Sequence, residues 1–177
     1  MIFILFSLVL VISVHVVMTK VIIDPHEEFE ECGNGMPMFS MNFSGLEITR
    51  KEDGTIFGNG KVKVLKDFNA PMKIFYYTKK LERGSWTRGI FSRLVPDFCA
   101  TMNNPLELWY NVTRFLPPCP IKAGQEIVLD NLKVGTVLEV VPPNLLGEWR
   151  IYNEMTTTRG LIPQSECKLI EFSVVEI

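Results

Sequence analysis

The chain has 177 residues, of which 47% are hydrophobic and 21% charged, and its formal net charge is −2 at neutral pH. This length is enough for one domain with a substantial hydrophobic core. Lysines and arginines are scattered along the chain and form no basic patch, so neither nucleic acid nor an anionic membrane surface is expected as a partner.

The first 19 residues contain no Lys, Arg, Asp or Glu and include two apolar runs, Ile2–Phe6 and Leu8–Ile12. This pattern is typical of a secretory signal peptide over residues 1–19. An uncleaved membrane anchor is the alternative. The apolar run falls short of the roughly 20 residues that span a bilayer, and it lacks a basic entry side. We therefore expect a secreted, extracellular protein with no stable membrane insertion.

The next segment, 20–31, has an acidic second half and is predicted to be a flexible mature amino terminus. Residues 32–177 are predicted to form a single domain. Alternating or β-rich stretches predict strands at 38–43, 46–49, 55–64, 72–77, 126–129, 134–140, 148–152 and 168–175. The period becomes helical over 97–116, between prolines that favour a helix start and end. We therefore expect a mostly β, antiparallel fold with a short helical insert.

Two triplets, which begin at Asn42 and Asn111, fit the N-glycosylation acceptor pattern. Phe39, Met41 and Phe43 alternate with polar residues, so a strand that buries these apolar side chains would turn Asn42 outward. Asn111 lies off the centre of a helical apolar stripe. That stripe comprises Leu108, Trp109, Val112, Phe115 and Leu116. Both asparagines are therefore predicted to be exposed and glycosylated.

Four cysteines, Cys32, Cys99, Cys119 and Cys167, all follow the predicted signal peptide. An even number of cysteines in a secreted chain indicates two disulfides, for which three pairings are possible. Their spacing is too wide for a zinc site without histidine partners, so no metal is expected.

Catalytic residues are poorly represented. His26 is the one histidine outside the predicted signal peptide, and it lies in the segment expected to be flexible, where it cannot serve as a well-placed base. Acidic residues such as Glu47 and Asp53 lie in polar, turn-like surroundings typical of a solvated surface. Neither enzyme activity nor a cofactor is expected, although a hydrolase with an unrecognised catalytic pair remains an alternative.

Aromatic and aliphatic residues near turns and in the insert are the candidates for a binding site. Trp86, Ile90 and Phe91 follow a glycine-containing turn, and Trp109 lies in the predicted helical insert. Exposed apolar side chains are costly in water unless they line a ligand site, so these four are predicted to form the mouth of an apolar cavity. An ordinary hydrophobic core is the alternative.

Four short motifs occur in order along the second half of the chain. They are Phe-Cys-Ala-Thr at 98–101, Cys-Pro-Ile-Lys-Ala-Gly at 119–124, Gly-Glu-Trp-Arg-Ile at 147–151 and Cys-Lys-Leu-Ile at 167–170. This series resembles the ganglioside activator protein and its insect relatives, the CheA/CheB chemosensory proteins and allied secreted domains. The resemblance extends from about Cys32 to the end of the chain.

This resemblance implies a lipid-recognition β-cup, in which antiparallel strands surround a lipid-sized apolar cavity and carry no catalytic machinery. It also implies that Cys32 pairs with Cys167 and Cys99 with Cys119. The chain has fewer cysteines than the vertebrate activator, which favours the insect chemosensory branch.

The expected function is therefore that of a secreted, non-enzymatic binding protein for a small hydrophobic ligand, such as a lipid, cuticular hydrocarbon or pheromone, in insect chemosensation. A sensory receptor or channel would be a further partner. The alternative is an accessory protein that presents lipids to a hydrolase or an immune receptor.

Overall fold

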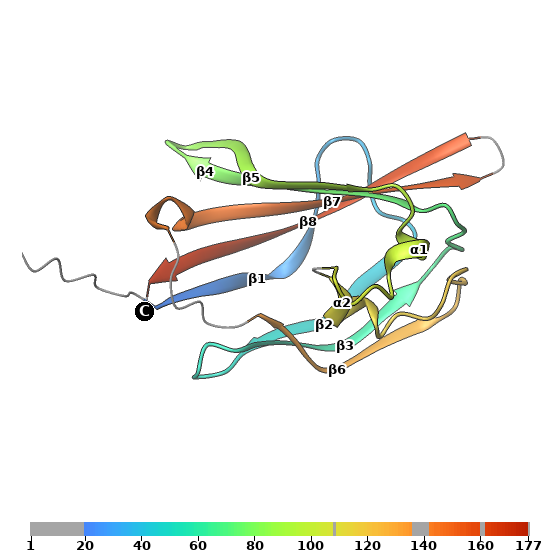
Figure 1. Cartoon of the computed structure of the whole chain (residues 1–177), viewed down its shortest axis with the longest axis horizontal. Coiled ribbons are helices and arrows are strands. Elements are labelled where there is room, and N and C mark those ends of the chain that lie inside the picture. Colours follow the sequence, from blue (N-terminus) through green and yellow to red (C-terminus); the bar gives the residue numbers. More distant parts are fainter. Residues whose placement is uncertain (1–19, 108, 136–141, 160–161, 177) are drawn as a thin grey trace, which may run out of the picture.

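The computed structural model describes residues 20–107, 109–135, 142–159 and 162–176. The predicted signal peptide, residues 1–19, lies outside the described residues. Within them, eight strands form two antiparallel sheets that face one another as a sandwich (Figure 1). This confirms the predicted mostly β, antiparallel fold.

The larger sheet has five strands and the smaller sheet has three. In spatial order, the larger sheet contains β1 (Val21–Glu31), β8 (Ile162–Glu176), β7 (Gly147–Arg159), β4 (Lys73–Glu82) and β5 (Ser85–Val95). The smaller sheet contains β2 (Met41–Arg50), β3 (Ile56–Val64) and β6 (Glu126–Gly135). The end of the strand predicted over 134–140 lies outside the described residues.

The helical insert between β5 and β6 is short, as predicted. It contains two one-turn helices, α1 (Phe98–Thr101) and α2 (Tyr110–Thr113), and a 3-10 turn, η1 (Pro143–Leu145), precedes β7. The Asp97 carboxylate caps α1 by accepting a hydrogen bond from the Cys99 amide at 3.1 Å. No helix in the described part of the chain is long and apolar enough to cross a membrane.

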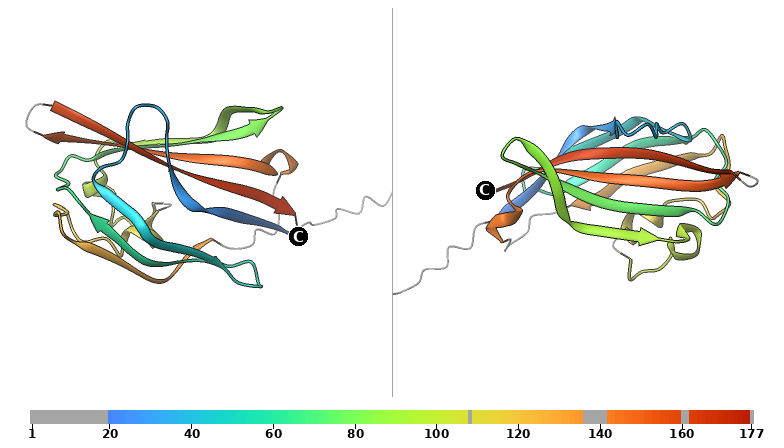
Figure 2. Two further views of the ribbon diagram at one scale, coloured as in Figure 1. Left: turned by 180° about the vertical axis from the view of Figure 1, so that it is seen from behind. Right: turned by 90° about the horizontal axis from the view of Figure 1, so that it is seen from above.

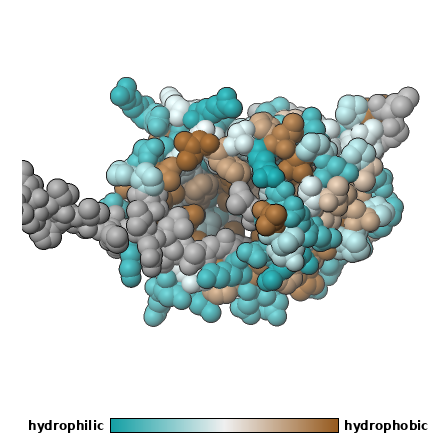
Figure 3. All heavy atoms as spheres, viewed as in Figure 1, coloured by the Kyte–Doolittle hydropathy of each residue, from teal (hydrophilic) through white to brown (hydrophobic). Residues whose placement is uncertain are grey.

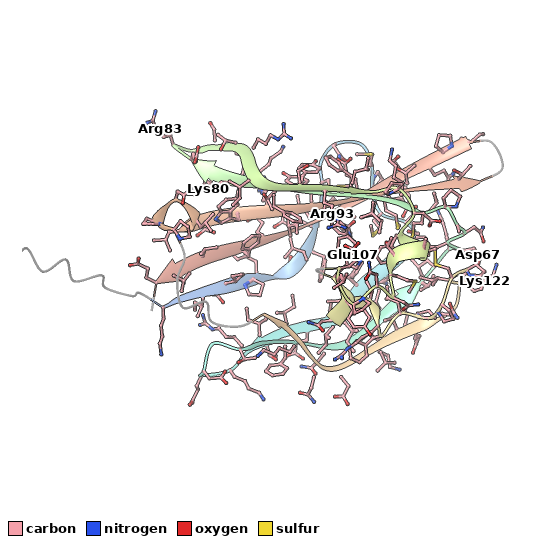
Figure 4. The ribbon with its side chains drawn as sticks, in the orientation of Figure 1. Asp67, Lys80, Arg83, Arg93, Glu107 and Lys122 are labelled. Atoms are coloured by element: carbon pink, nitrogen blue, oxygen red, sulfur yellow. A yellow bond between two sulfur atoms is a disulfide. The ribbon has the colours of Figure 1, made fainter. Side chains whose placement is uncertain are left out.

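Hydrophobic side chains from both sheets and the insert fill one end of the sandwich, which we call the filled end. Its most deeply buried members include Val64, Phe68, Met72, Met102 and Ile121. Here the Phe68 amide donates to the carbonyl of Ile121 at 2.8 Å. The Asp67 carboxylate lies 3.0 Å from the Lys122 ammonium at the same end (Figure 4). The insert therefore closes this end of the space between the sheets.

Two disulfides join segments that are distant in the chain. Cys32 is bonded to Cys167, 135 residues away, and Cys99 is bonded to Cys119, 20 residues away. These are the pairs that the resemblance implies. The first bond fixes the loop between β1 and β2 to β8, and the second closes the helical insert.

The segment predicted to be a flexible amino terminus is instead a strand. Residues Val21–Glu31 form β1, which pairs with β8 in an antiparallel register from Val21 opposite Glu176 to Glu31 opposite Lys168. The sequence Val21–Ile23 is rich in β-formers, and it outweighs the acidic residues that follow because those can remain exposed at the sheet edge. The folded domain therefore begins before Cys32.

Two further expectations about strands need correction. Residues Ser85–Val95, treated as a turn followed by apolar residues, form the edge strand β5. Phe39 was expected to be buried, but it is 58% exposed, whereas Ser40 is 3% exposed. The Ser40 amide and hydroxyl both donate to the buried Glu166 carboxylate, so Ser40 rather than Phe39 turns inward just before β2. Within β2 the expected alternation of Met41, Asn42 and Phe43 holds.

Candidate functional site

The inner face of the larger sheet is incompletely covered away from the filled end. Strands β7 and β8 lie in the interior of this sheet, yet Ile151, Ile170 and Phe172 on its inner face are only half-buried. Inner-facing residues of interior strands are normally buried by the opposite sheet. Figure 3 shows hydrophobic residues gathered along the region between the two sheets. Farther along the same face, Trp149 and Val174 are buried in a small cluster with Val21, so the incomplete cover is local.

A pocket of about 590 Å³ opens between the sheets on the side where β1 faces β2. Figure 2 shows these two strands from behind, joined by the loop that carries Cys32. Six apolar side chains line the pocket: Phe29, Met38, Met41, Phe43, Leu46 and Leu65. Four polar residues, Glu28, Asn42, Ser44 and Lys168, complete the lining. The volume lies within the usual range for small-molecule sites, and the lining is mixed in character.

Two contacts hold the pocket walls in place. The rings of Phe29 on β1 and Phe43 on β2 stack with their centroids 4.7 Å apart, so an aromatic pair bridges the two sheets. The Lys168 ammonium, in the pocket lining, forms an ion pair with Glu31. The Lys168 side chain is only 16% exposed, so this cation is largely shielded from water.

Lys168 belongs to a row of polar residues that crosses the inner face of the larger sheet. The strand registers place Arg93 opposite Tyr76, Tyr76 opposite Asn153, Asn153 opposite Lys168, and Lys168 opposite Glu31. We call these five residues the polar row. Apolar residues flank it on both sides, with Ile74 and Met155 towards the filled end and Ile151 and Ile170 away from it.

Both ends of the polar row are charge-balanced. At the β5 end, Arg93 donates to the Glu107 carboxylate at 2.7 Å, and its guanidinium lies 4.9 Å from the centre of the Trp109 ring. Figure 4 shows Arg93 and Glu107 next to one another between the larger sheet and the insert. At the β1 end, Lys168 pairs with Glu31. The two cations are therefore neutralised by two carboxylates.

Unsatisfied polar atoms occur in the middle of the polar row and in the indole beside it. Asn153 Oδ1 and Trp109 Nε1 are buried atoms that have no hydrogen-bond partner among the described residues. Trp109 stacks on Tyr76 with a centroid separation of 5.3 Å, so the indole lies beside the polar row. Burial raises the pKa of Tyr76 above its usual range, so its hydroxyl remains protonated and able to donate at neutral pH.

The four residues predicted to form a cavity mouth do not lie together. Trp86 lies on the outer face of the larger sheet, where the Arg150 guanidinium is 4.0 Å from its ring centre. Ile90 is 74% exposed on β5. Phe91 is partly buried, and its backbone exchanges hydrogen bonds with the Thr78 hydroxyl. Trp109 packs against the filled end.

Both predicted glycosylation acceptors, Asn42 and Asn111, are exposed. Asn42 also lies in the pocket lining, and its Oδ1 accepts a hydrogen bond from the Ser44 amide at 2.8 Å. The helical stripe predicted beside Asn111 is only partly correct. Trp109 and Leu116 pack against the core, but Val112 and Phe115 are exposed and Leu108 lies outside the described residues, because α2 is only one turn long.

His26 lies among carboxylates on the outer face of the larger sheet. Its ring nitrogens are 3.8 Å from Glu148 and 3.6 Å from Glu171. The neighbouring Ser173 hydroxyl donates to the Glu148 carboxylate at 2.8 Å, so its proton is not directed at the imidazole. A serine nucleophile needs a hydrogen-bonded base, and this cluster does not supply that arrangement. The described residues also contain no group of three or more His, Cys, Asp or Glu that could hold a metal ion.

Sequence reasoning missed the pocket residues because they come from separate segments. The alternation at Met41 and Phe43 predicted that these side chains share the inward face of a strand, and in the structure both line the pocket. Phe29 was assigned to a flexible segment, and nothing near Asn153 or Lys168 in the chain distinguishes these residues from other polar residues of a strand. Only the registers of β1, β7 and β8 bring them together.

No family model matches the chain, and no curated protein matches it.

Proposed function

We propose that this protein is a secreted, non-enzymatic carrier of a small hydrophobic ligand. The observation that supports this most directly is the pocket of about 590 Å³ between the two sheets, which six apolar and four polar residues line. Transfer of a ligand into such a pocket removes apolar surface from water, which contributes about 0.8 kcal/mol for each buried methylene. A chain of several methylenes is therefore enough for useful affinity.

Two further features support an extracellular carrier. The two disulfides are compatible with an oxidising compartment, and they reinforce a fold whose interior is not fully packed. The sequence motifs resemble those of insect chemosensory proteins of the CheA/CheB group, so we propose a cuticular hydrocarbon, pheromone or related lipid as the ligand and chemosensation as the setting. A sensory receptor or channel would then be the downstream partner.

The experiment is displacement of a neutral fluorescent probe, N-phenyl-1-naphthylamine, from the purified secreted protein by long-chain lipids. Phe43→Ala enlarges the pocket and removes the stack on Phe29, so probe affinity should fall several-fold. Phe57→Ala is the matched control, because Phe57 is also half-buried but lies outside the pocket lining, against Lys51. Failure of the wild-type protein to bind the probe or any long-chain lipid would refute the proposal.

A second candidate is an accessory protein that presents lipids at a surface. The helical insert exposes Leu106, which is 90% accessible, together with Val112 and Phe115. Exposed apolar residues clustered in one segment are typical of a surface that contacts lipid or protein. Co-sedimentation with neutral phosphatidylcholine vesicles tests this role. Vesicle binding that Leu106→Ser abolishes would favour a lipid-presenting role. If the wild-type protein does not bind vesicles, this second candidate function is refuted.

A further inference from the structure

One charged residue of the pocket lining has no partner of opposite charge. Glu28 on β1 lines the pocket and is itself exposed, so it lies where the pocket opens to solvent. It forms no ion pair with any residue in the described part of the chain. A pocket with apolar walls and an unpaired carboxylate at its opening is complementary to a ligand that carries an alkyl chain and a positive charge.

The cation in the same lining, Lys168, is already neutralised. Its ammonium pairs with Glu31 Oε1, and Glu31 Oε2 accepts a hydrogen bond from the Met38 amide at 3.3 Å. Both oxygens of that carboxylate are therefore engaged, and an anionic ligand would have to displace it from Lys168. With this pair balanced, the lining keeps the single negative charge of Glu28.

Other lysines on the neighbouring segments do not belong to the pocket lining. Lys61 and Lys63 alternate with buried valines on β3, so their ammonium groups lie on the outer face of the smaller sheet, where Glu126 pairs with both. The Lys66 ammonium lies 5.0 Å from the centre of the Phe39 ring. None of these three lysines lines the pocket, whereas Glu28 does.

Building on the proposed carrier function, we propose that the ligand is an amphiphile with a positively charged nitrogen in its head group, such as a long-chain amine. The head group lies beside Glu28 at the opening, and the alkyl chain extends along Phe29, Met41 and Phe43. The stacked rings of Phe29 and Phe43 border the same pocket, and the face of an aromatic ring also attracts a cation.

The exposure of Glu28 sets both the cost and the size of the expected preference. An ion that is fully buried loses its hydration at a large penalty, whereas a head group at the opening keeps part of its water shell. The same exposure limits the attraction, because an ion pair in contact with solvent is weak. We therefore expect a preference of about threefold for a cationic over a neutral head group.

The test compares dodecylamine, dodecanol and dodecanoate as competitors of bound N-phenyl-1-naphthylamine on the full secreted protein at neutral pH, where the amine is protonated and the acid is ionised. Dodecylamine should displace the probe at a concentration about threefold lower than dodecanol, and dodecanoate should require the highest concentration. Equal displacement by dodecylamine and dodecanol, or dodecanoate as the best competitor, would overturn the inference and leave the carrier function intact. If neither the probe nor any of the three compounds binds, the carrier function fails, and this inference fails with it.

A pair of charge-removing variants assigns the preference to one residue. Glu28→Gln removes the charge at similar volume, so it should abolish the preference for dodecylamine over dodecanol. Glu30→Gln is the matched control, because Glu30 is also an exposed carboxylate of β1 but lies outside the pocket lining, and it should retain the preference. Loss of the preference in both variants, or in neither, would overturn the assignment to Glu28.

The salt dependence of the wild-type protein gives a second measurement that does not require any variant to fold. Because an exposed ion pair is screened by salt, raising sodium chloride from about 0.05 M to about 0.5 M should reduce the preference for dodecylamine over dodecanol. A preference that does not change with salt would mean that the head group is not held by charge, and it would overturn the inference.

Discussion

The two ends of the sandwich differ in how their interiors are filled. At the filled end, side chains from both sheets and the insert pack together, and Phe68 is 1% exposed. At the other end, residues of equal apolar character, such as Ile151 and Phe172, remain half-buried on interior strands. The difference shows that packing is most extensive at the end that the insert closes, whereas the other end holds only a smaller buried cluster of Val21, Trp149 and Val174.

Removal of a disulfide is expected to have the largest effect on the free energy of unfolding. The Cys32–Cys167 bond spans 135 residues and the Cys99–Cys119 bond spans 20. The chain-entropy relation assigns roughly 5 kcal/mol to the longer crosslink and roughly 3 kcal/mol to the shorter one. Urea unfolding should therefore show a larger loss of stability when Cys32 and Cys167 are both replaced by serine than when Cys99 and Cys119 are.

The shorter bond closes the insert at the filled end, so its loss should also expose the core there. If the Cys99/Cys119 variant were the less stable of the two, packing by the insert would outweigh chain entropy, and the filled end would depend on the helices more than on the sheets.

Phe68 in the filled end and Phe43 in the pocket lining test whether the two regions differ in packing. Phe68→Ala leaves a cavity in the filled end and should cost about 3–5 kcal/mol. Phe43→Ala borders an existing pocket, so we expect less than about half that cost, together with weaker probe binding. Thermal melting and probe titration on both variants make the comparison. Equal destabilisation would mean that the pocket wall is ordinary core.

Trp86 and Trp109 were both predicted to lie at the mouth of a cavity, but their replacement is expected to affect stability to different extents. Trp86→Ala removes the contact with Arg150 on the outer face and should cost about 1 kcal/mol without a change in probe affinity. Trp109→Ala removes an indole that packs on Tyr76 and the filled end, and it should destabilise the fold by about 3 kcal/mol. A loss of probe affinity in a stable Trp86 variant would restore the original mouth assignment for that residue.

The smallest expected effect concerns the glycans. Protein from a eukaryotic secretory pathway should lose mass at both Asn42 and Asn111 on treatment with an amide-cleaving glycosidase. Because Asn42 lies in the pocket lining, a glycan there should slow ligand entry, so Asn42→Gln should increase the association rate of the probe a few-fold. Asn111→Gln is the control and should leave that rate unchanged. No mass change at either intact site would count against export.

Much of the fold could be predicted because local patterns and tertiary structure agree. The alternation over 55–64 and the Asp53-Gly54 turn before it correspond to β3 and its turn, where the Thr55 amide donates to the Asp53 carboxylate at 2.9 Å. That contact lowers the pKa of Asp53. The short insert was predictable from its prolines. β5 was not, because Gly89 interrupts its pattern where a side chain would collide with Thr78.

The sequence by itself determined the mostly β class, the capacity for two disulfides and the candidate glycan sites, because each depends on residue type and local spacing. Only the tertiary structure decided the site. Glu31, Tyr76, Arg93, Asn153 and Lys168 come from five strands, and they form one row only through the strand registers. A shift of one residue in any register would turn that strand's member of the row to the outer face, and no local pattern specifies registers between strands so distant in the chain.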